Sequence, residues 1–278
     1  MARTELGAWF IQMMMRKGRI RQDLTQREIA EEVHIATDTY RAYEAGRSCP
    51  TPASIKALAK ACGISDEIAE YMVNVAVARR KGHAIEADTR FNTLFIALAE
   101  AHYGFFFKFD ASMIPGPLQL QEYHYIVVRL SEPLATEHFL DGGWKFKDER
   151  QQTIEARTDR PVMQFLIGET ALLQLRAISE ELYQDQMAHL RRWARRPGVF
   201  IRVLRGPVPA QRSNFSIYME GESDLAGPSI AYTETIDSSW VIDDSLRIAR
   251  YDEFRKALWK KAIRIEVYHD DDRRDRLA

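Results

Sequence analysis

Apolar residues recur at helical spacing through the first eighty residues of the chain. From Leu6 to Met15 they crowd a helical pattern, which predicts a first helix with a wide buried face. The polar and basic stretch 18–23 is expected to interrupt this helix. Apolar residues spaced by three and four predict two further helices, over 53–62 and 64–77.

The clearest local signal begins at Thr25. Thr25 and Glu28 fit a capping box, in which the hydroxyl accepts from the Glu28 amide and the carboxylate reaches back to the helix start. A tight turn is predicted over 34–36, and a second short helix runs from Thr37 to Gly46, where the glycine ends it. Five helices with a tight turn between the second and third are typical of proteins that offer a helix to the DNA major groove.

Three stretches in this region share one ordered pattern. They are Leu24-Thr25-Gln26-Arg27-Glu28-Ile29-Ala30, Tyr43-Glu44-Ala45-Gly46-Arg47 and Pro50. In order and spacing the segment resembles the Cro/repressor-type helix-turn-helix family, also called xenobiotic-response-element (XRE) regulators. The resemblance implies transcription regulation through binding to double-stranded DNA.

Carried over by position, the resemblance predicts a set of DNA-binding residues. They are Gln26, Thr37, Asp38, Thr39, Arg41, Ala42 and Arg47. Gln26 would anchor the second helix on a phosphate, and Arg47 lies past the recognition helix, where phosphate is also expected. Arg41 either binds guanine O6 and N7 or contacts phosphate, while Asp38 either accepts from a cytosine amine or favours the helix dipole.

Two further residues of this region are expected to face inward, and some positions depart from the family pattern. Tyr40 is expected to face the core, and Glu44 to tie the end of the helix to its neighbours. His34 stands where the family has glycine in a left-handed turn, and Ala36 replaces the usual Ser or Thr cap. These departures affect the geometry of the DNA contacts more than the fold.

Beyond residue 80 the pattern changes to mixed strands and helices. Arg79 to Gly82 reads as a linker or as extra phosphate contacts. Predicted strands cover 103–109, 162–167, 199–204, 215–219, 229–236 and 239–242, and predicted helices cover 86–102, 118–126, 145–157, 180–196 and a last one opened by Asp244. The predicted fold is an all-α five-helix helix-turn-helix domain over 1–80, a linker or connecting helix over 81–92, and an α+β regulatory and dimerisation domain over 93–278.

Several stretches of the larger part also share a pattern. They are Ile114-Pro115-Gly116-Pro117-Leu118-Gln119, Glu122-Tyr123, Glu149-Arg150-Gln151-Gln152, Ile167-Gly168-Glu169-Thr170-Ala171-Leu172, Pro197-Gly198-Val199 and Tyr232-Thr233-Glu234-Thr235. This part resembles the antitoxin-like C-terminal domain that follows such helix-turn-helix modules in many actinobacterial regulators. The resemblance implies a small partner protein, often encoded nearby, and no known ligand.

Composition narrows the class of protein. The net charge is −1, and residues 1–83 carry 13 Lys and Arg against 10 Asp and Glu, a weak excess in the direction expected for a DNA-binding end. Cys49 and Cys62 form neither a zinc pattern nor a disulfide framework. No run approaches the ~18 apolar residues of a membrane span, and Trp9 to Met15 is too short for a signal peptide. A cytoplasmic protein without metal or cofactor is expected.

Catalytic patterns are absent from the sequence. It has no Gly-x-Ser-x-Gly, His-Glu-x-x-His, P-loop or dinucleotide glycine motif, and its seven histidines lack ligand spacing, so an enzyme is not expected. Glu169 and Glu234 lie at strand ends, where they either bond across the fold or line a ligand site. The leading hypothesis is a transcriptional regulator that binds a pseudo-palindromic operator as a homodimer and is modulated by a small partner protein. The alternatives are a repressor with an effector in a C-terminal pocket and an interaction module that has lost DNA binding.

Overall fold

The computed structural model describes residues 5–81, 86–87, 92–206, 214–234 and 239–269. The chain divides into two compact units. Unit 1 comprises Met1–Ala99 and Ile236–Asp243, and unit 2 comprises Glu100–Thr235 and Asp244–Ala278. A helical first region followed by mixed helices and strands confirms the predicted fold class.

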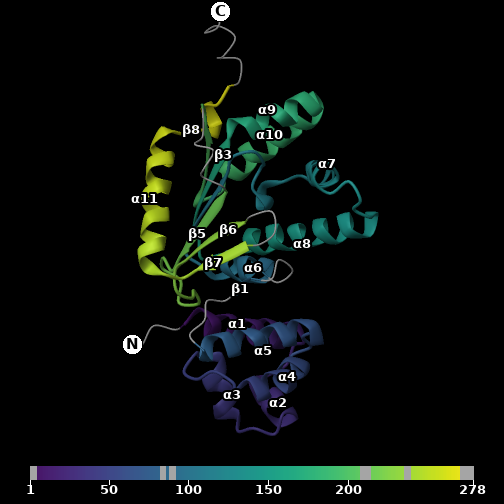
Figure 1. Ribbon diagram of the computed structural model, residues 1–278, viewed down its shortest axis with the longest axis vertical. Coiled ribbons are helices and arrows are strands. Elements are labelled where there is room, and N and C mark those ends of the chain that lie inside the picture. The colour runs from purple at the N-terminus through teal and green to yellow at the C-terminus, as the bar shows by residue number, and fades with distance from the viewer. Residues whose placement is uncertain (1–4, 82–85, 88–91, 207–213, 235–238, 270–278) are drawn as a thin grey trace, which may run out of the picture. The chain divides into compact units, whose positions relative to one another are not determined.

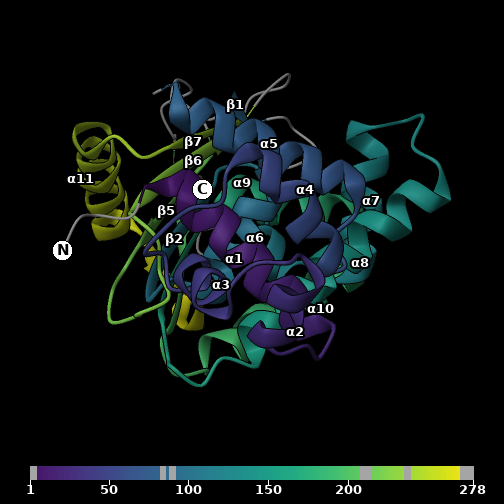
Figure 2. The same ribbon diagram turned by 90° about the horizontal axis from the view of Figure 1, so that it is seen from below.

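Unit 1 is built around five helices, as the apolar pattern predicts (Figures 1 and 2). They are α1 (Leu6–Arg21), α2 (Gln26–Glu32), α3 (Thr37–Glu44), α4 (Pro52–Ala61) and α5 (Asp66–Arg80). Helix α1 contacts α3, α4 and α5, and its Trp9, Phe10 and Met13 are buried. The apolar face of α1 is therefore the centre of this core.

The remaining elements of unit 1 come from two distant parts of the chain. Strand β1 (Glu86–Ala87) pairs antiparallel with β7 (Ser239–Ile242). Helix α6 (Asn92–His102) begins in this unit, where the Phe95 ring stacks on Phe10 with centroids 4.0 Å apart. Because of this stacking, unit 1 includes residues beyond the predicted domain end at residue 80.

Three predicted boundaries are wrong in unit 1. Helix α1 continues through the stretch 18–23 as far as Arg21, because Gly18 packs closely on Cys62: a Cβ at this glycine would lie 2.6 Å from the Cys62 carbonyl oxygen. Helix α5 includes Arg79 and Arg80, which were expected in a linker. Residues 86–87, predicted as the start of a helix, form strand β1, and the described helix α6 covers Asn92–His102.

Unit 2 contains a mixed β-sheet. Its strands are β2 (Phe105–Asp110), β3 (Val162–Gly168), β4 (Val199–Leu204), β5 (Phe215–Met219), β6 (Ile230–Glu234) and β8 (Ile263–Arg264), in the order β6-β5-β2-β3-β4-β8. The central β2, β3 and β4 are parallel, and β5, β6 and β8 run antiparallel to their neighbours. Parallel neighbours need long crossovers, which the intervening helices supply.

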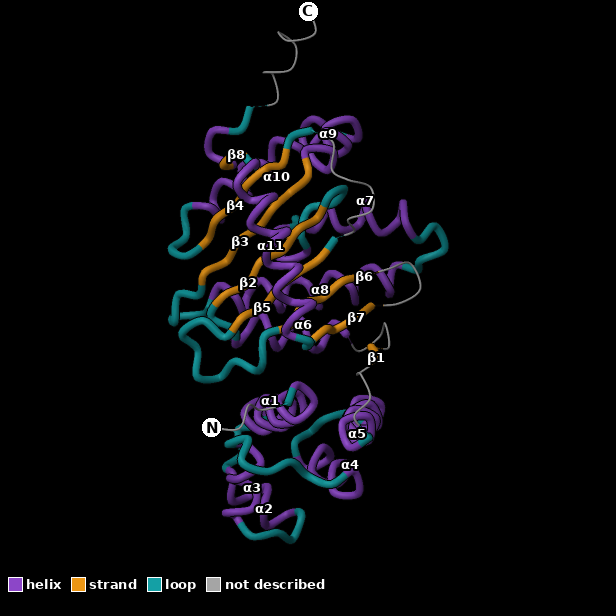
Figure 3. The backbone as a smooth tube through the Cα atoms, turned by 60° about the vertical axis from the view of Figure 1, so that its left-hand side comes forward, coloured by secondary structure: helices purple, strands orange, loops and turns teal. Residues whose placement is uncertain are grey.

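Helices cover both faces of this sheet (Figures 1 and 3). They are η1 (Gly116–Leu118), α7 (Gln121–Ser131), α8 (Glu137–Glu155), α9 (Glu169–Ile178), α10 (Glu180–Ala194), α11 (Ser245–Lys261) and η2 (Ile265–Val267). On the α11 face, Phe107 lies edge-on to Trp259, 6.2 Å between centroids. Successive strand residues point to opposite faces, so Phe106, Lys108 and Asp110 lie on the other side.

The face opposite α11 is polar on one half and apolar on the other. On β3 and β4 it carries buried Phe165 and Ile201, and α10 contacts β4. On β2, β5 and β6 the residues directly opposite one another are Lys108, Ser216 and Tyr232. Burying such polar groups costs free energy unless they find partners.

Candidate nucleic-acid interface

The start of α2 has the predicted capping box. The Thr25 hydroxyl accepts from the backbone N–H of Glu28 at 3.2 Å, and the Glu28 carboxylate accepts from the backbone N–H of Thr25 at 2.7 Å. These bonds satisfy donors that the helix itself leaves unpaired. The Thr25 hydroxyl also donates to the Glu28 carboxylate at 2.7 Å, and this bond together with the one from the Thr25 backbone N–H lowers the pKa of Glu28.

Backbone bonds close the turn between α2 and α3. His34 has a φ of 55°, the left-handed conformation that the resemblance places at this position. Its N–H donates to the Glu31 carbonyl at 3.2 Å, and the Ile35 N–H to the Ala30 carbonyl at 2.9 Å. Ala36 precedes α3 without a side-chain cap, as its methyl group requires. The turn keeps its shape although glycine and the usual cap are missing.

Glu44 ties three helices together. This side chain is 3% exposed, and its carboxylate accepts two hydrogen bonds from Arg19 of α1, at 2.6 and 2.9 Å, and one from Gln26 of α2 at 2.7 Å. Burial alone would raise the pKa of Glu44, but these bonds outweigh it and lower the pKa. The last turn of α3 is therefore held as a charged, fully paired joint.

The sequence had pointed to Glu44 but not to its main partner. Arg19 was expected outside the first helix, and the contact depends on α1 continuing past Gly18. The Gln26 side chain is bonded to Glu44, so it belongs to this joint. Its contact with a DNA phosphate stays a prediction.

Helix α3 has distinct inner and outer faces. Tyr40 is fully buried, and its hydroxyl lies 3.4 Å from the Cys62 sulfur. On the outer side, the Arg41 guanidinium donates to the Asp38 carboxylate at 3.0 Å, and these side chains are 57% and 89% exposed. Within unit 1, Thr37, Asp38 and Arg41 are thus presented together on the outside of a helix whose inside is fixed.

The other predicted contact residues lie on or next to α3. Thr39 and Ala42 are half-buried in the helix, and Arg47 is exposed just after Gly46. Gly46 has a φ of 67°, which favours glycine and ends the helix. The structure brings the predicted residues of the recognition helix into one short segment, and their contacts with DNA stay predictions.

Comparison with known proteins gives two matches. A family model described as "Helix-turn-helix" matches residues 15–68, and one described as "Domain of unknown function (DUF5753)" matches residues 99–266, more than half of the chain. The chain belongs to the DUF5753 family. Neither the curated proteins nor the solved structures searched contain a significant match.

The match at the N-terminal side of this DUF5753 protein decides its broad function. It covers α2, α3 and α4, the elements whose geometry is described above. The predicted resemblance to Cro/repressor-type helix-turn-helix proteins is confirmed, and the protein is a DNA-binding transcriptional regulator. Among the residues described, no helix combines the length and apolar character needed to cross a bilayer.

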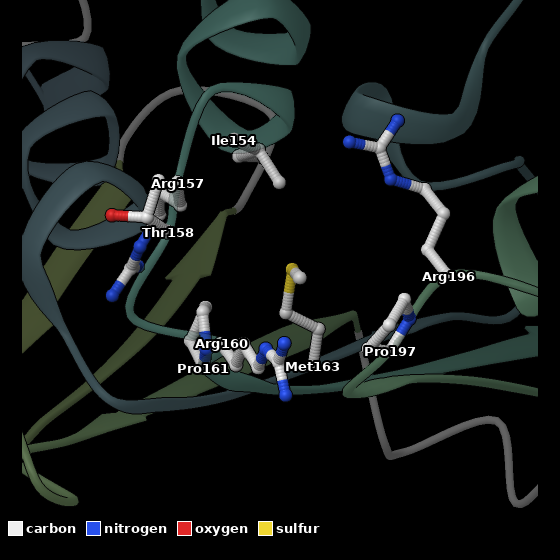
Figure 4. Close-up of a pocket in the computed structure, with 8 residues that line it drawn as sticks. All are labelled: Ile154, Arg157, Thr158, Arg160, Pro161, Met163, Arg196 and Pro197. Atoms are coloured by element: carbon white, nitrogen blue, oxygen red, sulfur yellow. The ribbon is translucent and has the colours of Figure 1, made fainter.

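Unit 2 of the DUF5753 protein has a pocket of about 300 Å³ where β3 begins and α8 and α10 end (Figure 4). Its lining residues are Ile154, Arg157, Thr158, Arg160, Pro161, Met163, Arg196 and Pro197. The three arginines raise the question of an anion site, because guanidinium groups bind phosphate and carboxylate well.

Two of these guanidinium groups already have anionic partners. Arg157 donates to the Asp159 carboxylate and to the Glu100 carbonyl, and Arg196 donates to the carboxylate and the carbonyl of Glu155. The Met163 and Ile154 side chains point into the middle of the pocket (Figure 4). Arg157 and Arg196 therefore each stabilise one carboxylate and one backbone carbonyl near a helix end. In the described part of the chain no group of acidic, His or Cys side chains has the arrangement of a metal site.

Proposed function

We propose that this DUF5753 protein binds a pseudo-palindromic operator as a homodimer and reads its sequence with the outer face of α3. The supporting observation is the rigid mounting of α3, whose inner side is held by Tyr40 and by the Glu44 joint while Asp38 and Arg41 are exposed. In a two-fold dimer, two such helices would enter half-sites about 34–36 Å apart along the duplex.

Each predicted contact residue has a proposed role. Arg41 donates to guanine O6 and N7, with Asp38 fixing the orientation of its guanidinium through their hydrogen bond. The methyl groups of Thr37 and Ala42 meet thymine methyl groups. Gln26, Thr39 and Arg47 contact phosphates, which set the register of the protein on DNA without reading sequence.

Unit 2 is proposed to dimerise and to tune DNA binding without catalysis. Its resemblance to antitoxin-like domains supports modulation by a small partner protein encoded nearby. Leu130, Leu134 and Phe139 at the α7–α8 connection are exposed, and exposed apolar groups support a protein contact here. The proposed place of action is the cytoplasm, where a bacterial regulator meets its DNA.

A small-molecule-sensing repressor is the second candidate function. Unit 2 holds an enclosed carboxylate oxygen, Oδ1 of Asp110, which lacks a hydrogen-bond partner among the described residues. Natural proteins seldom leave such an atom unpaired. An effector that reaches it would connect unit 2 to the control of DNA binding.

Selection of binding sites from random DNA tests the leading proposal. The purified full-length chain is expected to enrich a motif with two symmetric half-sites about 10 base pairs apart. Failure to enrich any DNA would contradict the proposal, and a single unpaired half-site would contradict the dimer.

Arg41→Ala tests the proposed base reading. It should cost about 1–3 kcal/mol of binding free energy on the best operator and relax the preference at one position of each half-site. Lys60→Ala is the matched control, because it removes an exposed positive charge from α4 of the same unit. An equal loss on operator and random DNA would show that Arg41 contacts phosphate alone.

A further inference from the structure

Six charged side chains gather on the polar half of the sheet in unit 2. Three are acidic and three are basic: Glu100, Asp110 and Glu234 against Lys108, Lys147 and Arg150. They come from four elements, α6, β2, β6 and α8. Their formal charges sum to zero, but some of these side chains have more hydrogen-bond partners than others.

One part of this cluster is fully paired. The Glu100 carboxylate is 1% exposed and accepts from Arg150 at 2.6 and 2.7 Å, with the Lys108 ammonium 2.8 Å away. Burial acts to raise the pKa of Glu100, but the two cations outweigh it and lower the pKa to about 2. This part joins α6, β2 and α8 as a permanent ion cluster, much as Glu44 joins the helices of unit 1.

The second part orients Lys147. Its ammonium donates to the Gln119 side-chain oxygen at 2.6 Å and to Nδ1 of His124 at 2.9 Å. His124 is fixed in turn, because its Nε2 lies 3.0 Å from the Leu140 carbonyl oxygen and donates to it. Burial lowers the pKa of Lys147 to about 8. An ammonium has three hydrogens, and the contacts described use two of them.

The third part lacks partners. Oδ1 of Asp110 has essentially no exposed surface and no hydrogen-bond partner among the described residues. Burial raises the pKa of Asp110 to about 7. Lys108 cannot neutralise Asp110 fully, since its ammonium is bound to Glu100. Ionisable groups whose pKa is strongly shifted by burial are found more often at functional sites than in the structural scaffold.

The position of Asp110 adds to this argument. It is the last residue of β2, at the carboxyl end of the parallel strands, the edge of such sheets where ligands bind. Asp110 itself is half-buried, and Glu234 at the end of β6 is exposed, with the Tyr232 hydroxyl donating to its carboxylate. The cluster therefore runs from an enclosed oxygen outward to a solvent-exposed carboxylate.

We propose that unit 2 binds a small uncharged molecule with a vicinal diol, as in a sugar or the ribose of a nucleoside, through Asp110 at the carboxyl end of β2. A strand-end carboxylate accepts hydrogen bonds from ribose hydroxyls in nucleotide-binding sheets, which is the chemistry required here. The remaining Lys147 hydrogen is available to a ligand oxygen.

The balance of charge favours an uncharged ligand. With three acidic and three basic side chains, the cluster has no net charge for a phosphate or an ammonium to neutralise. A charged ligand would therefore introduce an unpaired charge into a partly buried site, at a cost in desolvation. Hydroxyl groups supply the missing donors without that cost.

Calorimetric titration of the full-length chain tests this site without DNA. The probes are D-ribose and myo-inositol for sugars, adenosine for nucleosides, and 2′-deoxyadenosine and adenosine monophosphate as matched compounds that lack the diol or add a charge. At least one diol probe is expected to bind. Where adenosine binds, 2′-deoxyadenosine and the monophosphate should each bind at least tenfold more weakly. Binding of ribose without adenosine would assign the site to sugars.

Variants link the binding to the residues. Asp110→Asn should weaken the binding of the best probe at least tenfold. Glu222→Gln, which removes an exposed carboxylate from the same unit, is the control and should bind like the parent protein. The proposal is overturned if no diol probe binds at 10 mM-scale concentrations, if 2′-deoxyadenosine equals adenosine, or if Asp110→Asn binds unchanged.

The regulatory consequence of this site rests on the proposed function, but the binding itself does not. A diol ligand that changes operator affinity would make unit 2 the sensor of the second candidate function. Titration without DNA and site selection without ligand are separate measurements. Failure of the ligand site would leave the operator proposal intact, and failure of the operator proposal would leave the ligand site intact.

Discussion

Two enclosed carboxylates, one in each unit, differ in the number of donors that reach them. Glu44 accepts three side-chain hydrogen bonds, and its pKa is lowered although burial acts to raise it. Oδ1 of Asp110 accepts none from the described residues, and burial raises the pKa of Asp110 to about 7. Burial acts to raise the pKa of both carboxylates, and the number of hydrogen-bond donors decides which pKa is lowered and which is raised.

Glu100 shows that the difference between Glu44 and Asp110 does not come from their lying in different units. It shares unit 2 and the same face of the sheet with Asp110, yet Arg150 and Lys108 pair it completely. Its pKa is about 2, as expected of a permanently ionised carboxylate. We therefore interpret Glu44 and Glu100 as structural residues, and Asp110 as the residue that binds the proposed ligand.

The largest effect is expected for Glu100→Gln. Removing this charge leaves two buried cations, Arg150 and Lys108, close together without their counter-ion. Loss of one partner from a buried ion pair costs about 3–5 kcal/mol of the free energy of unfolding. Urea unfolding of unit 2, followed by tryptophan fluorescence, measures it. A loss below about 1 kcal/mol would contradict the scaffold interpretation.

Glu44→Gln is expected to lower the free energy of unfolding by about 2–4 kcal/mol, because Arg19 loses its counter-ion. The loss is somewhat smaller than for Glu100→Gln, because the new amide still accepts a hydrogen bond. Operator affinity should fall as well, since α1 holds α3 less firmly without the Arg19–Glu44 ion pair. Circular dichroism in urea and a DNA-binding titration measure the two effects.

The control for Glu44→Gln is Arg27→Ala, which breaks the exposed Arg27–Glu31 pair on α2. Exposed pairs contribute little, so its stability should stay within about 0.5 kcal/mol of the parent protein. Equal losses from the two variants would remove the distinction between a buried joint and a surface pair.

The smallest effect, and the one with the opposite sign, is expected for Asp110→Asn. The pKa of Asp110 in the folded state is about 7, above its ordinary value, so the folded protein binds this proton more tightly than the unfolded chain. The parent protein therefore loses stability as the pH rises from about 4 to about 7. Asp110→Asn should be more stable than the parent by roughly 1–3 kcal/mol at pH 8 and similar to it at pH 4.

Urea unfolding at these two pH values tests the sign. The groups that act on or near Asp110 are Lys108 on its own strand, Glu234 on β6, Lys147 on α8 and Tyr123 on α7. Glu100 has the opposite dependence, because its contribution is lost as the pH falls from about 4.5 towards about 2. A variant Asp110→Asn that is less stable than the parent at pH 8 would place Asp110 in the scaffold.

The sequence predicted much of the local structure. Strands β4, β5 and β7 begin and end at the predicted residues, and the Thr25–Glu28 capping box and the left-handed His34 are found as expected. These features depend on side chains within a few residues of one another. Local spacing and backbone preference therefore suffice to find them.

Predictions failed where packing between distant segments decided the outcome. Helix α1 was expected to stop before Gly18, but contacts with Cys62 carry it to Arg21. Helix α9 was missed: the strand was expected to end at Ile167, and no element was predicted for the apolar residues that follow it. In both cases the local pattern is compatible with more than one structure.

By itself, the sequence determined the order of helices and strands, the presence of a recognition helix and the residues on its outer face. The tertiary structure alone decided which charges meet: Arg19 with Glu44, Arg150 with Glu100, and nothing described with Oδ1 of Asp110. The physical reason is the distance along the chain over which each kind of interaction acts. Helix and strand periods are set by neighbours along the chain, whereas partners that lie 25 or 50 positions apart meet only when whole elements pack together.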